Sequence, residues 1–216
     1  TAFVTPFFLL PLMLYRDKCG KNVVCKNISD SVKSYLDSIH FEGGVVADSV
    51  SDFHNYMEYF SMKKYIPIIK FPGCKSKDSI KNDILSVAEN IMIRQLNIEG
   101  ELRKALSYML TETIDNISEH SESEFGYIFA QYYPSKSYID ICIADNGISI
   151  LGSYVKSGKG GITNDVEALK SAGKGISTKN LPDTENRGYG IRDLEEHIFC
   201  CQGKHFILCQ RKRHHI

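Results

Sequence analysis

Two alternating apolar runs constrain the fold of this chain more than any other feature. The runs GYIFAQYY (residues 126–133) and SYIDICIAD (137–145) place every second side chain on the same side, which is the period of a half-buried strand. A short turn around Pro134–Lys136 separates them, so we expect two neighbouring strands of one sheet. Helical patterns precede them at about residues 79–97 and 101–121. The chain therefore has the pattern of an α/β protein.

The first 65 residues predict a small α/β unit. An apolar, helix-like stretch occupies residues 3–15, a strand candidate follows at Asn22–Cys25, and Ser29 or Asp30 begins a helix that runs to Ile39. The run YIPIIKF (65–71) then reads as a strand and leads into a turn-rich connection. We place a domain boundary near residue 65, with a second domain over residues 66–216.

Composition excludes several functional classes. The 26 basic and 26 acidic residues cancel, so no net charge attracts nucleic acid or an anionic membrane.

The apolar stretch at residues 3–15 is shorter than the roughly 20 residues that span a bilayer, and it lacks the flanking residues of a signal peptide. Seven cysteines without CxxC pairs indicate neither a disulfide framework nor a zinc ribbon, so we expect a cytoplasmic protein. Because the chain opens with Thr rather than Met, we also expect that its native N-terminus is missing.

The helix at residues 101–121 carries polar side chains on its inner edge. At 100° per residue, its apolar side chains cover an arc of roughly 180°. Glu112 and Asn116 continue this arc about 40° apart, whereas Asp115 lies about 60° from Glu112 on the other side. An ionised carboxylate facing a core is costly without a partner, so this edge fits the wall of a cleft. A helix whose last two turns emerge into water fits this stretch equally well. The apolar arc consists of Leu102, Ala105, Leu106, Met109, Leu110, Ile114 and Ile117.

The second strand ends in Asp145, and Asn146-Gly147 then forces a tight turn. Asn-Gly between apolar runs is typical of a hairpin, but residues 149–164 hold four glycines and no clean returning strand. An aspartate at the end of a strand, beside a glycine-rich bend, is well placed to accept a hydrogen bond from a ligand.

A third pattern, RGYGI (187–191), places Gly188 and Gly190 just before a helix. Glycines there let the backbone approach a ligand, and the helix N-terminus favours an anion. An ordinary glycine turn is the alternative. The pattern is not a Rossmann fingerprint, because no strand leads into it and the third glycine is absent.

In this order and spacing, ExxDNxxEH (112–120), DNGIS (145–149) and RGYGI (187–191) resemble the N, G1 and G2 boxes of the GHKL superfamily of ATPases. The chain looks most similar to bacterial histidine-kinase-like ATP-binding proteins in which a STAS-like or sensor unit precedes the ATPase domain. The resemblance implies a Bergerat fold over residues 66–216, which is a two-layer α/β sandwich whose mixed sheet is covered by helices on one face.

The resemblance also implies ATP and Mg²⁺ as cofactors. Asn116 would hold the Mg²⁺, Asp145 would accept a hydrogen bond from the adenine amino group, and Gly147 would leave room for the base. Residues 152–186 would form a mobile lid over the nucleotide. The backbone N–H groups of Gly188, Tyr189 and Gly190 would hold the phosphates. Arg187 or Lys179 would add positive charge beside them.

Glu112 has the place of the general base in family members that activate water or a hydroxyl group. The resemblance therefore implies ATP hydrolysis, or transfer of the γ-phosphate to a Ser or Thr of a regulatory protein partner, and it allows a homodimer. A non-catalytic nucleotide switch and an interaction domain without nucleotide are the alternatives. The sequence departs from the usual DxGxG pattern at Ser149, which replaces the second glycine. Some relatives also have a histidine at the position of His120, and a histidine that caps the helix end is the alternative.

Overall fold

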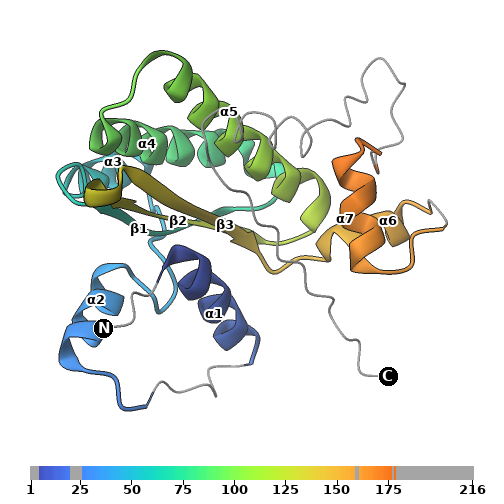
Figure 1. The fold of residues 1–216 in the computed structure, drawn as a ribbon, viewed down its shortest axis with the longest axis horizontal. Helices are drawn as coiled ribbons and strands as arrows, with labels where there is room; N and C mark the ends of the chain where they lie inside the picture. The colour runs from blue at the N-terminus through green and yellow to red at the C-terminus, as the bar shows by residue number, and fades with distance from the viewer. Residues whose placement is uncertain (1–4, 20–25, 159–160, 177, 179–216) are drawn as a thin grey trace. The chain divides into compact units, whose positions relative to one another are not determined.

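The structure is a computed structural model that describes residues 5–19, 26–158, 161–176 and 178 (Figure 1). The chain forms two compact units. The sheet unit comprises Thr1–Ile98 and Glu124–Asp145, and the helical unit comprises Glu99–Ser123 and Asn146–Ile216. The expected mixture of helices and strands is confirmed. Among the residues that the structure describes, no helix has the length and apolar character needed to cross a bilayer.

Within the described ranges, three antiparallel strands form the sheet, in the order β1-β2-β3. They are β1 (Tyr65–Pro72), β2 (Phe125–Tyr133) and β3 (Tyr138–Asp145). A 3₁₀ turn at Pro134–Lys136 joins β2 to β3, so the two predicted strands and their turn are confirmed. The strand candidate at residues 22–25 lies outside the described residues.

Strand β1 tolerates Pro67 because the ladder is interrupted there. The register between β1 and β2 shifts between Ile66 and Ile69, and a proline, which cannot donate a ladder hydrogen bond, is accepted at such a bulge. Residues before the strand pair with it: Ile68 N donates to Ile39 O at 2.9 Å, and Val45 N donates to Ile68 O at 2.7 Å. These bonds tie part of the first 65 residues to β1, and the domain boundary near residue 65 stays a prediction.

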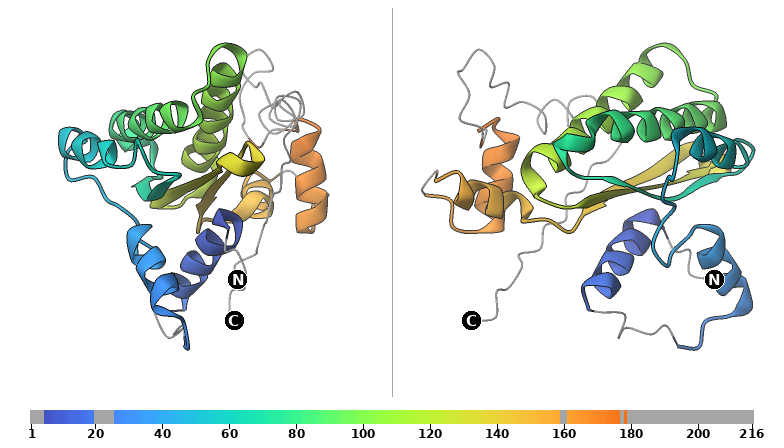
Figure 2. Two further views of the ribbon diagram at one scale, coloured as in Figure 1. Left: turned by 60° about the vertical axis from the view of Figure 1, so that its left-hand side comes forward. Right: turned by 180° about the vertical axis from the view of Figure 1, so that it is seen from behind.

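Helices pack on both faces of the sheet within this unit (Figures 1 and 2). We expected a mixed sheet with helices on one face, whereas the described strands are antiparallel, with one isolated parallel bridge between Val45 and Ile69. Helix α1 (Pro6–Lys18) covers one face, with Pro6 in its first turn and Pro11 inside it. Its side chains share a buried cluster with residues of β1 and β2, formed by Leu9, Leu10, Met13, Ile39, Phe41, Ile68, Tyr127 and Phe129.

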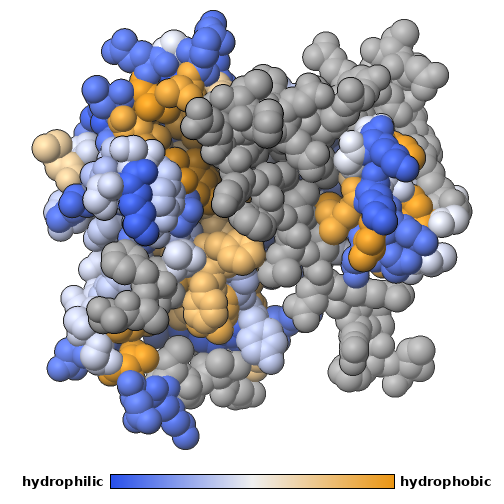
Figure 3. All heavy atoms as spheres, in the orientation of Figure 1, coloured by the Kyte–Doolittle hydropathy of each residue, from blue (hydrophilic) through white to orange (hydrophobic). Residues whose placement is uncertain are grey.

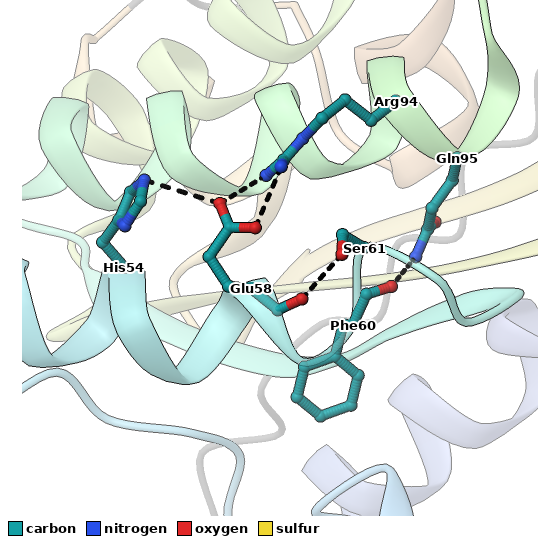
Figure 4. Close-up of polar contacts among 6 residues, drawn as sticks. All are labelled: His54, Glu58, Phe60, Ser61, Arg94 and Gln95. Atoms are coloured by element: carbon teal, nitrogen blue, oxygen red, sulfur yellow. Dashed lines mark hydrogen bonds and ion pairs between the residues drawn. The ribbon is translucent and has the colours of Figure 1, made fainter.

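Helix α4 (Asp78–Leu96) lies on the opposite face and is joined to α3 (Val50–Glu58). Figure 4 shows the contact: Arg94 donates to both carboxylate oxygens of Glu58, at 2.6 and 2.9 Å. These hydrogen bonds lower the pKa of the Glu58 carboxyl below its usual value. Gln95 Nε2 donates to the carbonyl oxygens of Phe60 and Tyr65. Because the ion pair is exposed, its main effect is to orient α3 rather than to add much stability.

The remaining helix of the sheet unit is α2 (Asp30–Ser38). The predicted cap is confirmed, because Ser29 Oγ accepts a hydrogen bond from Val32 N. The described cysteines, Cys19, Cys74 and Cys142, are free thiols. Burial raises the pKa of the Cys142 thiol to about 12, so this thiol is protonated and unreactive at neutral pH.

The helical unit contains α5 (Gly100–Asn116), a π-helical turn (Ile117–Ser121), α6 (Ser149–Lys156) and α7 (Asp165–Gly173). Helices α6 and α7 share a small core of Leu151, Tyr154 and Ala168. The outer side of α7 is mainly hydrophilic (Figure 3). The described part of the expected lid contains most of α6 and all of α7, and its movement over a nucleotide stays a prediction.

Candidate functional site

Helix α5 presents the polar edge that the sequence predicted. Leu106, Leu110 and Ile114 are buried, whereas Leu102 in the first turn is half exposed, at 51%. Glu112 and Asn116 are half-buried and Asp115 is exposed, which is the order expected from the helical wheel. Glu112 and Asn116 therefore lie at the border between the buried and the solvated side of the helix.

The helix changes its winding directly after Asn116. Ile117–Ser121 form a π-helical turn, and Glu122 then takes a left-handed conformation with φ 56°. Single π turns inside helices are frequent at functional sites. Because a π turn is wider than an α turn, the positions that a 100° wheel assigns to Glu119 and His120 no longer hold.

Two hydrogen bonds join the end of this turn to the Asn-Gly turn. Ile148 N donates to Ser121 O at 2.8 Å, and Ser123 Oγ donates to Asn146 Oδ1 at 2.7 Å. Ser121 and Ser123 are buried, at 6% and 5% exposure, and Ser123 N donates to Ser121 Oγ. The end of the first sequence motif thus meets residues 146–148 of the second motif inside the helical unit. Sequence reasoning missed both serines, although serines directly after a helix commonly bond to nearby backbone.

His120 is fixed by contacts from later parts of the chain. Its Nδ1 lies 3.1 Å from Thr178 Oγ1, and its carbonyl oxygen accepts a hydrogen bond from Ser153 Oγ at 3.4 Å. Its Nε2 lies 3.8 Å from a carboxylate oxygen of Glu119. His120 therefore connects the π turn to α6 and to Thr178, which is more than a cap on the helix end.

Asp145 is the last residue of the sheet unit. It ends β3 opposite Gly126 of β2 and is half-buried. Gly147, two residues later, is half-buried in the helical unit. The predicted strand end is confirmed and the chain bends at residues 147–148, whereas the role of Asp145 toward adenine stays a prediction.

The other predicted binding residues lie outside the described residues. They are Lys179, Arg187, Gly188, Tyr189 and Gly190. Within the described ranges, no group of three or more His, Cys, Asp or Glu side chains is arranged to hold a metal ion.

Ser149 occupies a backbone conformation that suits glycine. Its φ is 67°, at the position where the related pattern has the second glycine of DxGxG. Its Oγ accepts a long hydrogen bond, 3.4 Å, from Gly152 N. The side chain thus gains little from this contact and carries the cost of a left-handed conformation.

We expect Ser149→Gly to raise the free energy of unfolding by about 0.5–1 kcal/mol, because glycine adopts positive φ without steric cost. Urea denaturation measures this change. Ser157 at the other end of α6 has φ −70°, so Ser157→Gly is the matched control and should destabilise. A loss of stability in Ser149→Gly would contradict the strain argument.

Comparison with known proteins gives no match. No protein-family model, no curated protein and no solved structure is found to be similar to this chain.

Proposed function

We propose that this chain binds ATP with Mg²⁺ at a site of the GHKL type and acts on the γ-phosphate. The observation that carries the proposal is a pair of hydrogen bonds at the Asn146–Ile148 turn: Ile148 N donates to Ser121 O, and Ser123 Oγ donates to Asn146 Oδ1. They connect the end of the helix that bears Glu112 and Asn116 to the turn that follows Asp145. Two motifs that lie apart in the sequence are thereby linked, as a shared ligand site requires.

The residues present suit a nucleotide-bound magnesium ion. Mg²⁺ prefers oxygen ligands and is usually bound through only one or two protein groups, with phosphates and water completing its shell. The half-buried Asn116 offers one amide oxygen, and the described residues offer no larger metal cluster that would compete. When bound, Mg²⁺ would neutralise charge on the phosphates.

Glu112 lies one helical turn before Asn116 and is the proposed general base. Side chains four residues apart on a helix are neighbours, so the Glu112 carboxylate would lie close to a nucleophile beside the γ-phosphate. It would accept a proton from water, giving hydrolysis, or from a Ser or Thr hydroxyl of a regulatory protein partner, giving phosphoryl transfer. The competing proposal is a nucleotide switch without turnover, and it needs Asn116 and Asp145 but not Glu112.

The proposal is tested by ligand-dependent stability and by turnover. We expect ATP with Mg²⁺ to raise the melting temperature, because a ligand that binds only the folded state stabilises it.

In Glu112→Ala, ATP hydrolysis should fall by about 10²- to 10⁴-fold, the usual contribution of a general base, while ATP affinity is retained. Asp115→Ala removes the exposed carboxylate of the same helix turn and should keep activity.

The two candidate functions then separate. Wild-type protein that binds ATP but shows no turnover, with or without candidate partner proteins, would favour the switch. Wild-type protein whose melting temperature does not respond to ATP or Mg²⁺ would contradict both.

A further inference from the structure

A hydroxyl group and a carboxylate lie at the two nitrogens of the His120 imidazole. Thr178 Oγ1 is 3.1 Å from Nδ1, and a carboxylate oxygen of Glu119 is 3.8 Å from Nε2. The backbone of His120 is held as well, because its carbonyl oxygen accepts a hydrogen bond from Ser153 Oγ. All four residues belong to the helical unit, so their contacts lie within one compact body.

This arrangement suits the transfer of a proton from the hydroxyl to the ring. A neutral imidazole has one N–H donor and one acceptor nitrogen, and the negative charge of Glu119 favours the proton on Nε2. Nδ1 is then the acceptor of the hydrogen bond from Thr178 Oγ1. A hydroxyl within hydrogen-bond reach of a base, which a third group orients, is the arrangement that activates a nucleophile.

The Thr178 hydroxyl is also placed where a ligand can reach it. The side chains of Glu119 and His120 are each 27% exposed, and Thr178 is half-buried. His120 lies in the π turn that begins directly after Asn116, so the base is about one turn beyond the proposed Mg²⁺ ligand. The electrophile that the proposed function brings to this end of the helix is the γ-phosphate of ATP.

We propose that Thr178 is an internal acceptor of the γ-phosphate, with His120 as its catalytic base; this inference rests on the proposed function. Thr178 Oγ1 forms a bond to the γ-phosphorus, the bond from that phosphorus to the β,γ-bridging oxygen breaks, and ADP leaves. The hydroxyl proton passes to His120 Nδ1. The products are a phosphothreonine at this position, ADP and a protonated imidazole.

The test is mass spectrometry of peptides from wild-type protein incubated with ATP and Mg²⁺. We expect phosphate on Thr178, at a rate that does not depend on protein concentration, because the acceptor and the base belong to one chain. Thr178→Ser keeps the hydroxyl and should still be phosphorylated, whereas Thr178→Val removes it. In His120→Asn, phosphorylation of Thr178 should fall by about 10²- to 10⁴-fold, because an amide oxygen accepts the hydrogen bond but takes up no proton.

Thr163→Val is the matched control. Thr163 is exposed, and its Oγ1 donates to a carboxylate oxygen of Glu167 rather than to an imidazole. Phosphorylation of Thr178 should be unchanged in this variant, and Thr163 should stay unmodified in the wild type. Phosphate on Thr163 instead of Thr178 would show that exposure alone selects the hydroxyl, which would overturn the inference.

The remaining outcomes separate this inference from the proposed function. ATP turnover by wild-type protein without phosphate on Thr178 would overturn the inference while the proposed function stands. A rate that rises with protein concentration, or full phosphorylation of His120→Asn, would also overturn it. Wild-type protein that does not bind ATP would overturn the proposed function and this inference together. If His120→Asn does not fold, the position of the phosphate in wild type and Thr178→Ser decides.

Discussion

Gly126→Ala should lower the free energy of unfolding by about 2–3 kcal/mol, near the upper end of the cost of overpacking a core. A β-carbon added at Gly126 would lie 2.3 Å from Cζ and 2.4 Å from Cε2 of Phe71. Phe71 is opposite Gly126 in the β1–β2 ladder and is fully buried, so its ring has no free space to enter. An aromatic ring that covers a glycine on the neighbouring strand is a known device for stabilising a glycine in a sheet. Urea denaturation followed by circular dichroism measures the change.

Gly43→Ala is the control for glycine replacement in the same unit. No atom lies within 4 Å of a β-carbon at Gly43, and its φ is not in the left-handed region, so alanine should be neutral or slightly stabilising there. The double variant Gly126→Ala with Phe71→Leu tests the cause, because the smaller side chain leaves room for the new methyl group. It should lose less stability than the sum of the two single variants. Additive losses would mean that the Phe71 ring is not the group that excludes alanine.

The sequence predicted those elements whose pattern is local. Strands β2 and β3 follow from strict alternation, and α2 from Ser29 as its cap. Helix α3 was missed although its cap is local, since Ser49 Oγ accepts a hydrogen bond from Asp52 N. The helix is short, and its ion pair with Arg94 joins residues far apart in the sequence. The helix-like stretch at residues 3–15 was predicted and is confirmed as α1, but its packing against a sheet face was missed, because that packing joins residues far apart in the sequence.

The candidate site was predictable along one helix but not between segments. The wheel placed Glu112 and Asn116 correctly at the edge of the core, because both precede the change to π winding. It could not place His120, which follows that change. The bond from Ser123 to Asn146 joins residues 23 positions apart, and no periodic pattern encodes such a pairing between two turns.

Asp145→Ala should weaken ATP binding on the order of 10- to 100-fold, the effect of losing a hydrogen bond to a charged group. On the proposed function, the Asp145 carboxylate is the acceptor for the adenine amino group, so its loss should affect ATP more than GTP. Titration calorimetry with Mg²⁺ and each nucleotide measures both affinities. Gly126 pairs with Asp145 on one side and with Phe71 on the other. Because Gly126 has no side chain, the Phe71 ring lies over the Gly126 backbone.

Asp140→Ala is the matched control for this change, because Asp140 lies on the same strand near its other end. Burial raises the pKa of the Asp140 carboxyl, although the hydrogen bond from Tyr133 and the charge of Lys136 oppose this shift. Removing that carboxylate does not touch the Asn-Gly turn. Asp140→Ala should therefore keep ATP affinity. If Asp145→Ala also keeps it, Asp145 is not the adenine acceptor and the GHKL proposal fails at the residue on which its base recognition depends. A loss confined to Asp145→Ala, with the circular dichroism spectrum unchanged, would locate base recognition at the end of β3.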